Sequence, residues 1–244
     1  MKALISDFDG TLYFHYNSPR VKIIDMKKIQ KFQKCNLFIL CTGRHMSSVQ
    51  ILNDYSIQCD YYICASGAII INKMKELIYK QPLQKNIVNK ILNKYSDYYL
   101  YVLSESKIYH LNNSVDEKSN VNVIDNVDQI TENILGISIN ANSVDNAKNI
   151  VNYLNKNYNV TALQNGQYID VVSSNCSKGK AVGYLKKLLN LDIVGTIGDS
   201  YNDIDMLNKS DISFTFPSSP DEVKNAAKYE VSGVAEAIEI LENI

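Results

Sequence analysis

Residues 3–12 read Ala-Leu-Ile-Ser-Asp-Phe-Asp-Gly-Thr-Leu, and this stretch decides the fold. Its first four residues form a short apolar run whose length suits a buried strand. The run stops at Asp7, and a second carboxylate follows at Asp9. Ligands of open α/β sheets bind beyond the carboxyl ends of the strands, so both carboxylates are candidates for chemistry. Gly10 would permit a sharp turn after them and leave backbone N–H groups for an anion.

The same alternation continues on both sides of the chain's middle. Further apolar runs at 37–41, 61–64 and 193–197 alternate with stretches of helical period at 21–34 and 178–189. Buried strands that alternate with amphipathic helices are typical of a parallel α/β sheet. We therefore expect an α/β protein with a Rossmann-like, doubly wound parallel sheet as its core.

The middle of the chain has a different pattern of predicted elements. Between residues 82 and 172, strand-like runs follow one another closely, and Asn165-Gly166 is a hairpin turn signal. This pattern favours an inserted α+β cap over residues 82–172. The core would then be formed by residues 1–81 together with residues 173–244.

Composition argues against several classes of protein. Of 244 residues, 45% are hydrophobic, which is enough to bury a core. The 25 basic residues nearly balance the 26 acidic ones, so the basic excess of a nucleic-acid binder is missing. No apolar run reaches the roughly 18–20 residues that span a bilayer, and a carboxylate at Asp7 interrupts any signal peptide. We expect a cytoplasmic protein with neither a nucleic-acid nor a membrane partner.

Five cysteines form no Cys-x-x-Cys pair, and three histidines are widely spaced, so neither a disulfide frame nor a zinc site is expected. We interpret Cys41 as a core thiol despite its place beside a candidate motif. His45 follows Arg44 and is a candidate to line the site, but it is interpreted as a surface histidine on a helix. His15, just after the first motif, is a candidate to approach a substrate.

Three more polar clusters follow a predicted strand or open a predicted helix. Thr-Gly-Arg at 42–44 offers a hydroxyl and a loop N–H that suit a phosphate oxygen. Ser-Lys-Gly-Lys-Ala at 177–181 places a lysine where it can neutralise a phosphate or a carboxylate. Gly-Asp-Ser-Tyr-Asn-Asp at 198–203 supplies two carboxylates, and oxygen ligands suit Mg²⁺. Taken singly, each cluster also reads as an ordinary cap, a solvated lysine or a polar loop.

Together, the four motifs resemble those of the haloacid dehalogenase superfamily of phosphotransferases, in its Cof-type, sugar-phosphatase-like branch. They occur in the order Asp-x-Asp-Gly-Thr-Leu, Thr-Gly-Arg, Ser-Lys-Gly-Lys-Ala and Gly-Asp-x-x-Asn-Asp-x-x-Met, over essentially the whole chain. The resemblance implies a phosphoric monoester hydrolase with a cap inserted between the second and third motifs. One departure is Ser66-Gly67-Ala68, where the family often has Asn-Gly-Ala.

The resemblance also implies catalytic roles. Asp7 would be the nucleophile that forms an aspartyl-phosphate, and Asp9 would be the general acid and base. Mg²⁺ would be held by Asp7, by the backbone carbonyl of Asp9 and by Asp199. Lys178 would hold phosphoryl oxygens and offset the charge of Asp7, and Asp203 would position Lys178 or a metal-bound water.

The remaining motif residues would bind the phosphoryl group. Thr42 and Asn202 would contact its oxygens through their side chains, and Gly10 and Gly43 through backbone N–H groups. Arg44 either reaches the phosphate or an acidic substrate group, or forms a structural pair.

Reaction type and substrate stay open at this point. P-type ATPases carry Thr at the position of Asp9; a carboxylate can activate water, so a hydrolase or a mutase is favoured. A phosphomutase resembling the phosphomannomutases, or a phosphometabolite-binding module without turnover, remains an alternative. Sugar phosphates are the favoured substrates, with pyridoxal phosphate and flavin mononucleotide as alternatives. A monomer and a homodimer fit the sequence equally.

Overall fold

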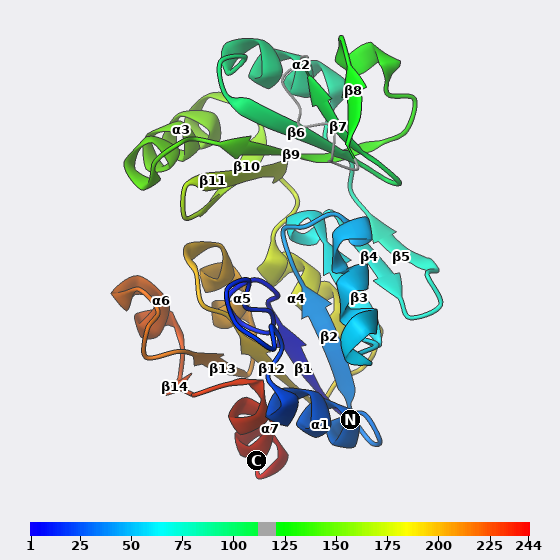
Figure 1. The fold of residues 1–244 in the computed structure, drawn as a ribbon, viewed down its shortest axis with the longest axis vertical. Helices are drawn as coiled ribbons and strands as arrows, with labels where there is room; N and C mark the ends of the chain where they lie inside the picture. The colour runs from blue at the N-terminus through cyan, green and yellow to red at the C-terminus, as the bar shows by residue number, and fades with distance from the viewer. Residues whose placement is uncertain (112–120) are drawn as a thin grey trace.

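The computed structural model of the protein describes residues 1–111 and 121–244, which form two sheets with helices packed against them (Figure 1). Residues 112–120, part of the predicted insertion, lie outside the described residues. Both ends of the chain contribute to the larger sheet, and the middle forms the smaller one. The predicted fold class is confirmed.

The larger sheet has eight strands in the order β14-β13-β12-β1-β2-β3-β4-β5. Its strands are β1 Lys2–Ser6, β2 Leu37–Cys41, β3 Tyr61–Cys64, β4 Ile69–Asn72, β5 Leu77–Lys80, β12 Ile193–Ile197, β13 Ile212–Thr215 and β14 Tyr229–Glu230. The strands from β14 to β3 are parallel, as expected. The edge strands β4 and β5 are antiparallel, because four residues connect β3 to β4 and a parallel crossover needs a dozen or more.

Helices cover both faces of the larger sheet. Leu4 lies in one buried cluster with Ile29 of α1 (Ile23–Phe32) and Ile238 of α7 (Val234–Glu242). Its neighbour Ile5 lies in a second cluster with Val182 of α4 (Lys178–Leu188). Successive strand residues point to opposite faces, so the short run that opens the chain packs against both helix layers. Two shorter helices, α5 (Ile204–Lys209) and α6 (Asp221–Ala226), complete this part.

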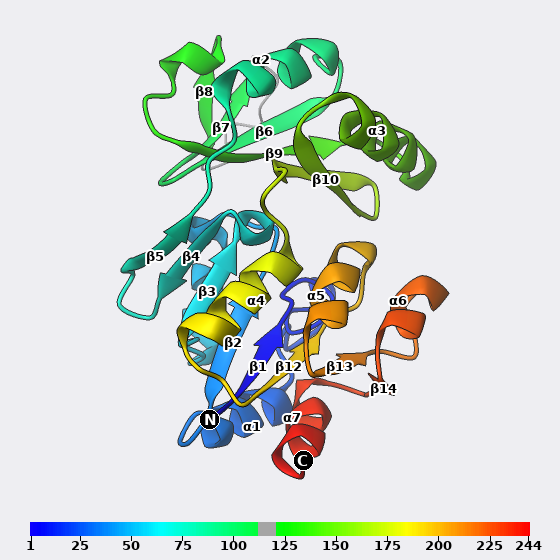
Figure 2. The ribbon, with the colours of Figure 1, turned by 180° about the vertical axis from the view of Figure 1, so that it is seen from behind.

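The smaller sheet has six strands in the order β10-β11-β9-β6-β7-β8. Its strands are β6 Tyr99–Ser104, β7 Ile108–Leu111, β8 Asn122–Ile124, β9 Ile134–Asn140, β10 Val160–Asn165 and β11 Tyr168–Ser173. Helices α2 (Lys85–Lys94) and α3 (Val144–Asn157) cover the face that points away from the larger sheet (Figures 1 and 2). A separate apolar core lies beneath these helices, so the opposite face is turned toward the larger sheet.

Short 3₁₀ segments complete the described elements, and no helix among these residues is long and apolar enough to cross a membrane. They are η1 Met46–Tyr55, η2 Ala65–Gly67, η3 Val127–Gln129 and η4 Tyr201–Asp203. The segment η1 follows the second motif, where the sequence indicates an ordinary helix. Three strands, β5, β8 and β14, were not expected, since β5 is partly exposed and β8 and β14 have three and two residues.

Candidate active site

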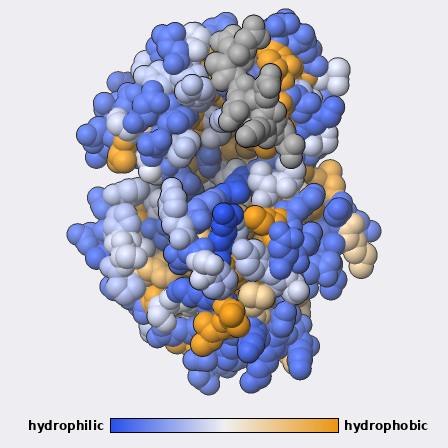
Figure 3. All heavy atoms as spheres, viewed as in Figure 1, coloured by the Kyte–Doolittle hydropathy of each residue, from blue (hydrophilic) through white to orange (hydrophobic). Residues whose placement is uncertain are grey.

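A cavity of about 590 Å³ lies between the two sheets, at the carboxyl ends of β1, β2 and β12. The space-filling view shows the surface indented between the upper and lower halves, with hydrophilic residues at the indentation (Figure 3). The larger sheet contributes residues of three motifs to this cavity, namely Asp7, Asp9, Thr42, Gly43, Arg44 and Asn202. The parallel topology therefore gathers motifs that are far apart in sequence at one sheet edge.

A buried lysine joins two carboxylates at the floor of this site. Lys178, the first residue of α4, is 0% exposed, and its Nζ lies 2.6 Å from Oδ1 of Asp7 and 2.7 Å from Oδ1 of Asp203. Ser177 caps the helix by accepting a hydrogen bond from the backbone N–H of Lys180, so Lys178 enters the site at a fixed point. Burial opposes the charge of Lys178, but the two carboxylates prevail and raise its pKa well above the usual value.

For Asp7, the effect of burial on the pKa outweighs the effect of its ion pair with Lys178. Burial, and then the carboxylate of Asp203, raises its pKa well above the usual value, although Lys178 acts against both. A carboxylate that is desolvated and beside another carboxylate is destabilised in its ionised form. A further positive charge close to Asp7 would stabilise its ionised form.

Asp203 is fully engaged by protein donors. Its Oδ1 accepts from Lys178, and its Oδ2 accepts from the backbone N–H groups of Asp199 and Ser200 at 3.0 and 3.1 Å. Its carboxylate thus fixes both the lysine and the loop after β12.

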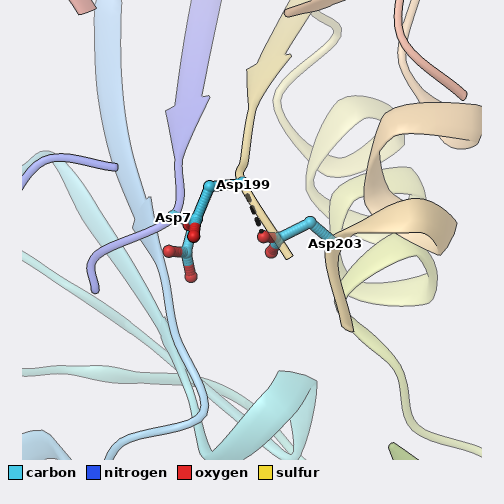
Figure 4. A group of neighbouring side chains, drawn as sticks. All are labelled: Asp7, Asp199 and Asp203. Atoms are coloured by element: carbon cyan, nitrogen blue, oxygen red, sulfur yellow. Dashed lines mark hydrogen bonds between the residues drawn. The ribbon is translucent and has the colours of Figure 1, made fainter. Parts of the chain in front are cut away.

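The carboxylate of Asp199 lies next to that of Asp7 (Figure 4). Its Oδ1 accepts a hydrogen bond from Thr11 at 2.8 Å, and its carboxylate lies against Gly10, where an added Cβ would be 2.5 Å from Oδ2. Gly10 also has φ of +83°, which favours glycine. Burial, followed by the charge of Asp203, raises the pKa of Asp199 to about 6.

The donor set fits a divalent cation. Oxygens of Asp7, Asp199 and Asp203 lie within 4.8 Å of one another, and hard cations such as Mg²⁺ prefer oxygen ligands. Lys178 pairs with two of these carboxylates, and Asp199 adds a third acidic group, so the cluster has an excess of acidic side chains. Since Asp203 is taken up by its own donors, Asp7 and Asp199 are the side chains left to hold such an ion.

Asp9 is turned toward a different group of residues. Its two oxygens face Nε and Nη2 of Arg44, both at 2.7 Å, and Nε2 of His15 lies 2.8 Å from Oδ1. His15 also approaches Nη2 of Arg44 at 2.9 Å. The carboxylate of Asp9 is therefore outside the acidic group, and a role for this residue at a cation would depend on its backbone carbonyl.

The second motif forms one wall of the cavity. Thr42 is buried, and its Oγ1 accepts from the backbone N–H of Arg44 at 3.1 Å. Gly43 leaves space for Asp170 of β11, because an added Cβ would be 2.1 Å from Oδ2 of that carboxylate. Asn202 is buried on the opposite wall.

The interpretation of His45 as a surface residue is wrong. It is 4% exposed and lines the cavity. Its Nδ1 accepts a hydrogen bond from the backbone N–H of Ser47 and so caps the start of η1. Burial lowers the pKa of His45. Cys41 is buried, as expected, and burial raises its pKa above the usual value.

Asp170 of β11 lines the cavity but was not among the site residues selected from the sequence. Ser66 donates a hydrogen bond from Oγ to Oδ2 of Asp170 at 2.8 Å, which links the two sheets across the cavity. One signal was present: Asp170 interrupts an apolar strand at an alternate position. Its contact with Ser66 spans 104 residues and has no counterpart in local sequence.

Comparisons with known proteins agree with this geometry. Residues 4–238 match the sequence model of the haloacid dehalogenase-like hydrolases. An uncharacterized protein of Mycoplasma capricolum is 29% identical over 229 residues, covering 84% of this chain and 86% of its own length. A phosphoglycolate phosphatase of Sulfurisphaera tokodaii is 29% identical over 228 residues, covering 91% of this chain and 83% of its own length.

Solved structures share the whole fold. A haloacid dehalogenase-like hydrolase from B. subtilis superposes with a TM-score of 0.87 at 21% identity, over 99% of this chain and 100% of its own. The subclass IIB sugar phosphatase BT4131 gives a TM-score of 0.84 at 19% identity, over 100% of both chains. At such identities the likeness concerns the arrangement of the chain.

Proposed function

This chain belongs to the haloacid dehalogenase-like hydrolases, and we propose that it is a Mg²⁺-dependent phosphatase acting on a small phosphorylated metabolite. The observation that carries the proposal is the buried contact of Lys178 with both Asp7 and Asp203. Burying an ion pair this deeply costs desolvation free energy, so it is weak evidence for a role in stability alone. Carboxylates with perturbed pKa values in a cleft are candidates for catalysis.

In the first step, a carboxylate oxygen of Asp7 attacks phosphorus while the bond from phosphorus to the ester oxygen breaks. Asp9 gives a proton to the departing oxygen, and an aspartyl-phosphate remains on Asp7. Lys178 offsets the negative charge that Asp7 and the phosphoryl oxygens bring together.

In the second step, Asp9 takes a proton from water as the water oxygen attacks phosphorus. The bond to Asp7 breaks, inorganic phosphate leaves, and the Asp7 carboxylate is restored. Thr42, Asn202 and the N–H group of Gly43 hold phosphoryl oxygens in place during both steps. The N–H group of Gly10, which the sequence also suggested for this role, instead donates to the backbone carbonyl of Tyr13 at 3.0 Å.

The proposed metal site consists of Asp7, Asp199 and the backbone carbonyl of Asp9. When bound, Mg²⁺ would screen the phosphate from the Asp7 carboxylate and keep the reacting oxygens in line. Asp203 holds Lys178 and the loop that carries Asp199, so its contribution is positional.

We further propose that the smaller sheet and its helices act as the cap, bounded near residues 82 and 172. The cap would exclude water from the phosphoryl group and contact the leaving group. Sugar phosphates are the favoured substrates; the sugar phosphatase BT4131 has the same fold over its whole length. A phosphomutase remains the second candidate because its reaction needs the same nucleophile.

Phosphate release from a panel of phosphorylated metabolites and an aryl phosphate tests the proposal. We expect release with Mg²⁺, none with chelator, and none from the Asp7→Asn variant. The exposed Asp54→Asn is the matched control and should retain activity. Activity in Asp7→Asn would reject the assigned nucleophile, and isomer interconversion without release would favour the mutase.

A further inference from the structure

Asp170 lies in an ordered row of residues on the cavity-facing side of the smaller sheet. Asp170 of β11 pairs with Ser138 of β9, which pairs in turn with Tyr101 of β6. All three line the cavity, and the alternate residues Ile169 and Val171 are buried in the core on the other side. Strand alternation therefore presents a carboxylate, a hydroxyl and a phenol side by side to whatever enters the cavity.

The Asp170 carboxylate is held in one position from the larger sheet. Ser66 donates to Oδ2 at 2.8 Å, and Gly43 lies so close that no side chain fits between them. Ser66 has φ of 51° inside a turn in which Ala65 and Gly67 also have positive φ. Among the described residues, Ser66 is the hydrogen-bond donor to this carboxylate, and it uses Oδ2, so Oδ1 is left for a ligand.

Position and charge distinguish this carboxylate from the reacting groups. Asp170 lies against Gly43, whose N–H group is proposed to hold a phosphoryl oxygen. Asp170 would therefore face the part of a leaving group next to the ester oxygen. Among the described residues that line the cavity, the basic ones come from the larger sheet and are His15, Arg44 and His45. The described residues from the smaller sheet are uncharged apart from Asp170, and they are Tyr101, Leu103, Ile108, Val121, Ser138, Asn165 and Tyr168.

Burial raises the pKa of Asp170, while the hydrogen bond from Ser66 and the charge of Lys178 act in the opposite direction. In its ionised form, the carboxylate accepts hydrogen bonds and repels anions. It has no proton to donate, so a hydroxyl or an amine is its natural partner. A second negative charge on the leaving group would be repelled in a partly desolvated cavity, where charges interact more strongly than in water. A leaving group without a hydrogen-bond donor would leave Oδ1 of Asp170 without a partner in the closed cavity, which is also unfavourable.

We propose that Asp170 selects substrates by the charge of the leaving group, favouring monoesters of uncharged, hydroxyl-bearing alcohols over esters that carry a second anionic group. The inference rests on the proposed phosphatase function and names its substrate class. Under this rule, polyol and sugar monophosphates are substrates, whereas bisphosphates and phosphorylated hydroxy acids are poor ones.

Two matched substrate pairs test the rule. Glycerol 3-phosphate and 3-phosphoglycerate differ only in a CH₂OH group that is a carboxylate in the second compound, and glucitol 6-phosphate and 6-phosphogluconate differ in the same way. We expect kcat/KM to favour the uncharged member of each pair by about tenfold or more, consistent with the discrimination that a single charged contact provides. In Asp170→Asn the preference should shrink about tenfold, mainly because KM for the carboxylate ester falls.

Controls separate this outcome from others. Asp145→Asn, exposed on α3 of the same sheet, should leave both preferences unchanged. If Asp170 only ties the sheets together, Ser66→Ala and Asp170→Asn would lower activity on both members equally, and the inference would be rejected. Equal kcat/KM for both members in the native protein would also reject it. Failure to hydrolyse even an aryl phosphate would instead reject the proposed function, and the inference with it.

Discussion

Asp9 and Arg44 form a two-pronged ion pair, in which Nε lies 2.7 Å from Oδ2 and Nη2 lies 2.7 Å from Oδ1. Such paired contacts fix the orientation of a carboxylate as well as its distance. The proposed acid and base is therefore held in a defined position by the residue that follows Gly43 in the second motif. The predicted contact of Arg44 with the substrate remains a prediction, and it would require this ion pair to rearrange.

Kinetics of Arg44→Ala distinguish the two roles. If Arg44 only orients Asp9, kcat should fall by about 10- to 100-fold with little change in KM, since a positioned acid and base contributes about 10²–10⁴. If Arg44 also binds the phosphate, KM should rise as well. Arg44→Lys keeps the charge without the fork and should recover little of kcat. A variant with unchanged kcat and KM would contradict both roles.

Addition of Mg²⁺ should raise the melting temperature of the protein at pH 7. The ion would offset the charge of the desolvated carboxylates, and binding at 100 times Kd stabilises a folded state by about 2.7 kcal/mol. Asp199→Asn should abolish this rise, and Asp54→Asn should retain it. Scanning calorimetry with Mg²⁺ and with chelator measures the effect. An equal rise in Asp199→Asn would place the ion elsewhere.

His45 should make the protein less stable as the pH falls through the ordinary histidine range. Its pKa is lowered by burial, so the unfolded chain binds a proton at a pH where the folded protein does not. Stability is then fully present above the unfolded pKa, near 6.5, and decreases below it. His45→Asn retains an N-cap acceptor for Ser47 but does not titrate. Urea unfolding at pH 7.5 and 5.5 should show a smaller loss in the variant; an equal loss would exclude His45 as the cause.

Gly43→Ala should reduce activity strongly. Its Cβ would lie 2.1 Å from Oδ2 of Asp170, so the carboxylate must shift away from its contact with Ser66. Displacements of about 1 Å near reacting groups can reduce rates by about 100-fold. Gly183→Ala is the matched control, because nothing lies within 4 Å of the added Cβ in α4. That control should keep activity and gain about 0.5–1 kcal/mol of stability. Equal activity of both variants would show that Asp170 can move without consequence.

Asp25 should matter for stability and leave catalysis unaffected. It is buried in α1, and its Oδ1 accepts from the backbone N–H of Ala235 at 2.7 Å, at the start of α7. Asp25→Ala should lose about 1–2 kcal/mol in urea unfolding, as expected for a removed cap. Burial raises the pKa of Asp25, so Asp25→Asn, which keeps an acceptor without the charge, should lose less. A larger loss in Asp25→Asn would show that the charge itself stabilises α7.

Strand-end reasoning found much of the site from sequence. Asp7, Thr42 and Asp199 each follow an apolar run, and the parallel order of β12, β1 and β2 brings those ends together. Local patterns also predicted the hairpin at Asn165-Gly166, where Gly166 has φ of +58°.

Contacts between distant segments were not predictable in this way. The antiparallel direction of β4 is a local exception: the four-residue connection to β3 already excludes a parallel crossover, and the expectation of a parallel sheet overlooked it. His45 reads as exposed because nothing near it indicates that the smaller sheet covers it. The contact of Asp170 with Ser66, and that of Asp25 with α7, depends on tertiary packing that helical or strand periodicity does not describe.

The smaller sheet has an apolar core of its own beneath α2 and α3, while its residues Leu103, Leu135 and Val172 belong to the main core of the larger sheet. Residues such as Tyr101, Ser138 and Asp170 belong to none of these cores, although they line the cavity. Their replacement therefore changes what the cavity accepts with little effect on folding or on the reacting carboxylates. Such an arrangement makes specificity evolvable: new substrates can be acquired through a few substitutions on one sheet face while the chemistry is inherited intact.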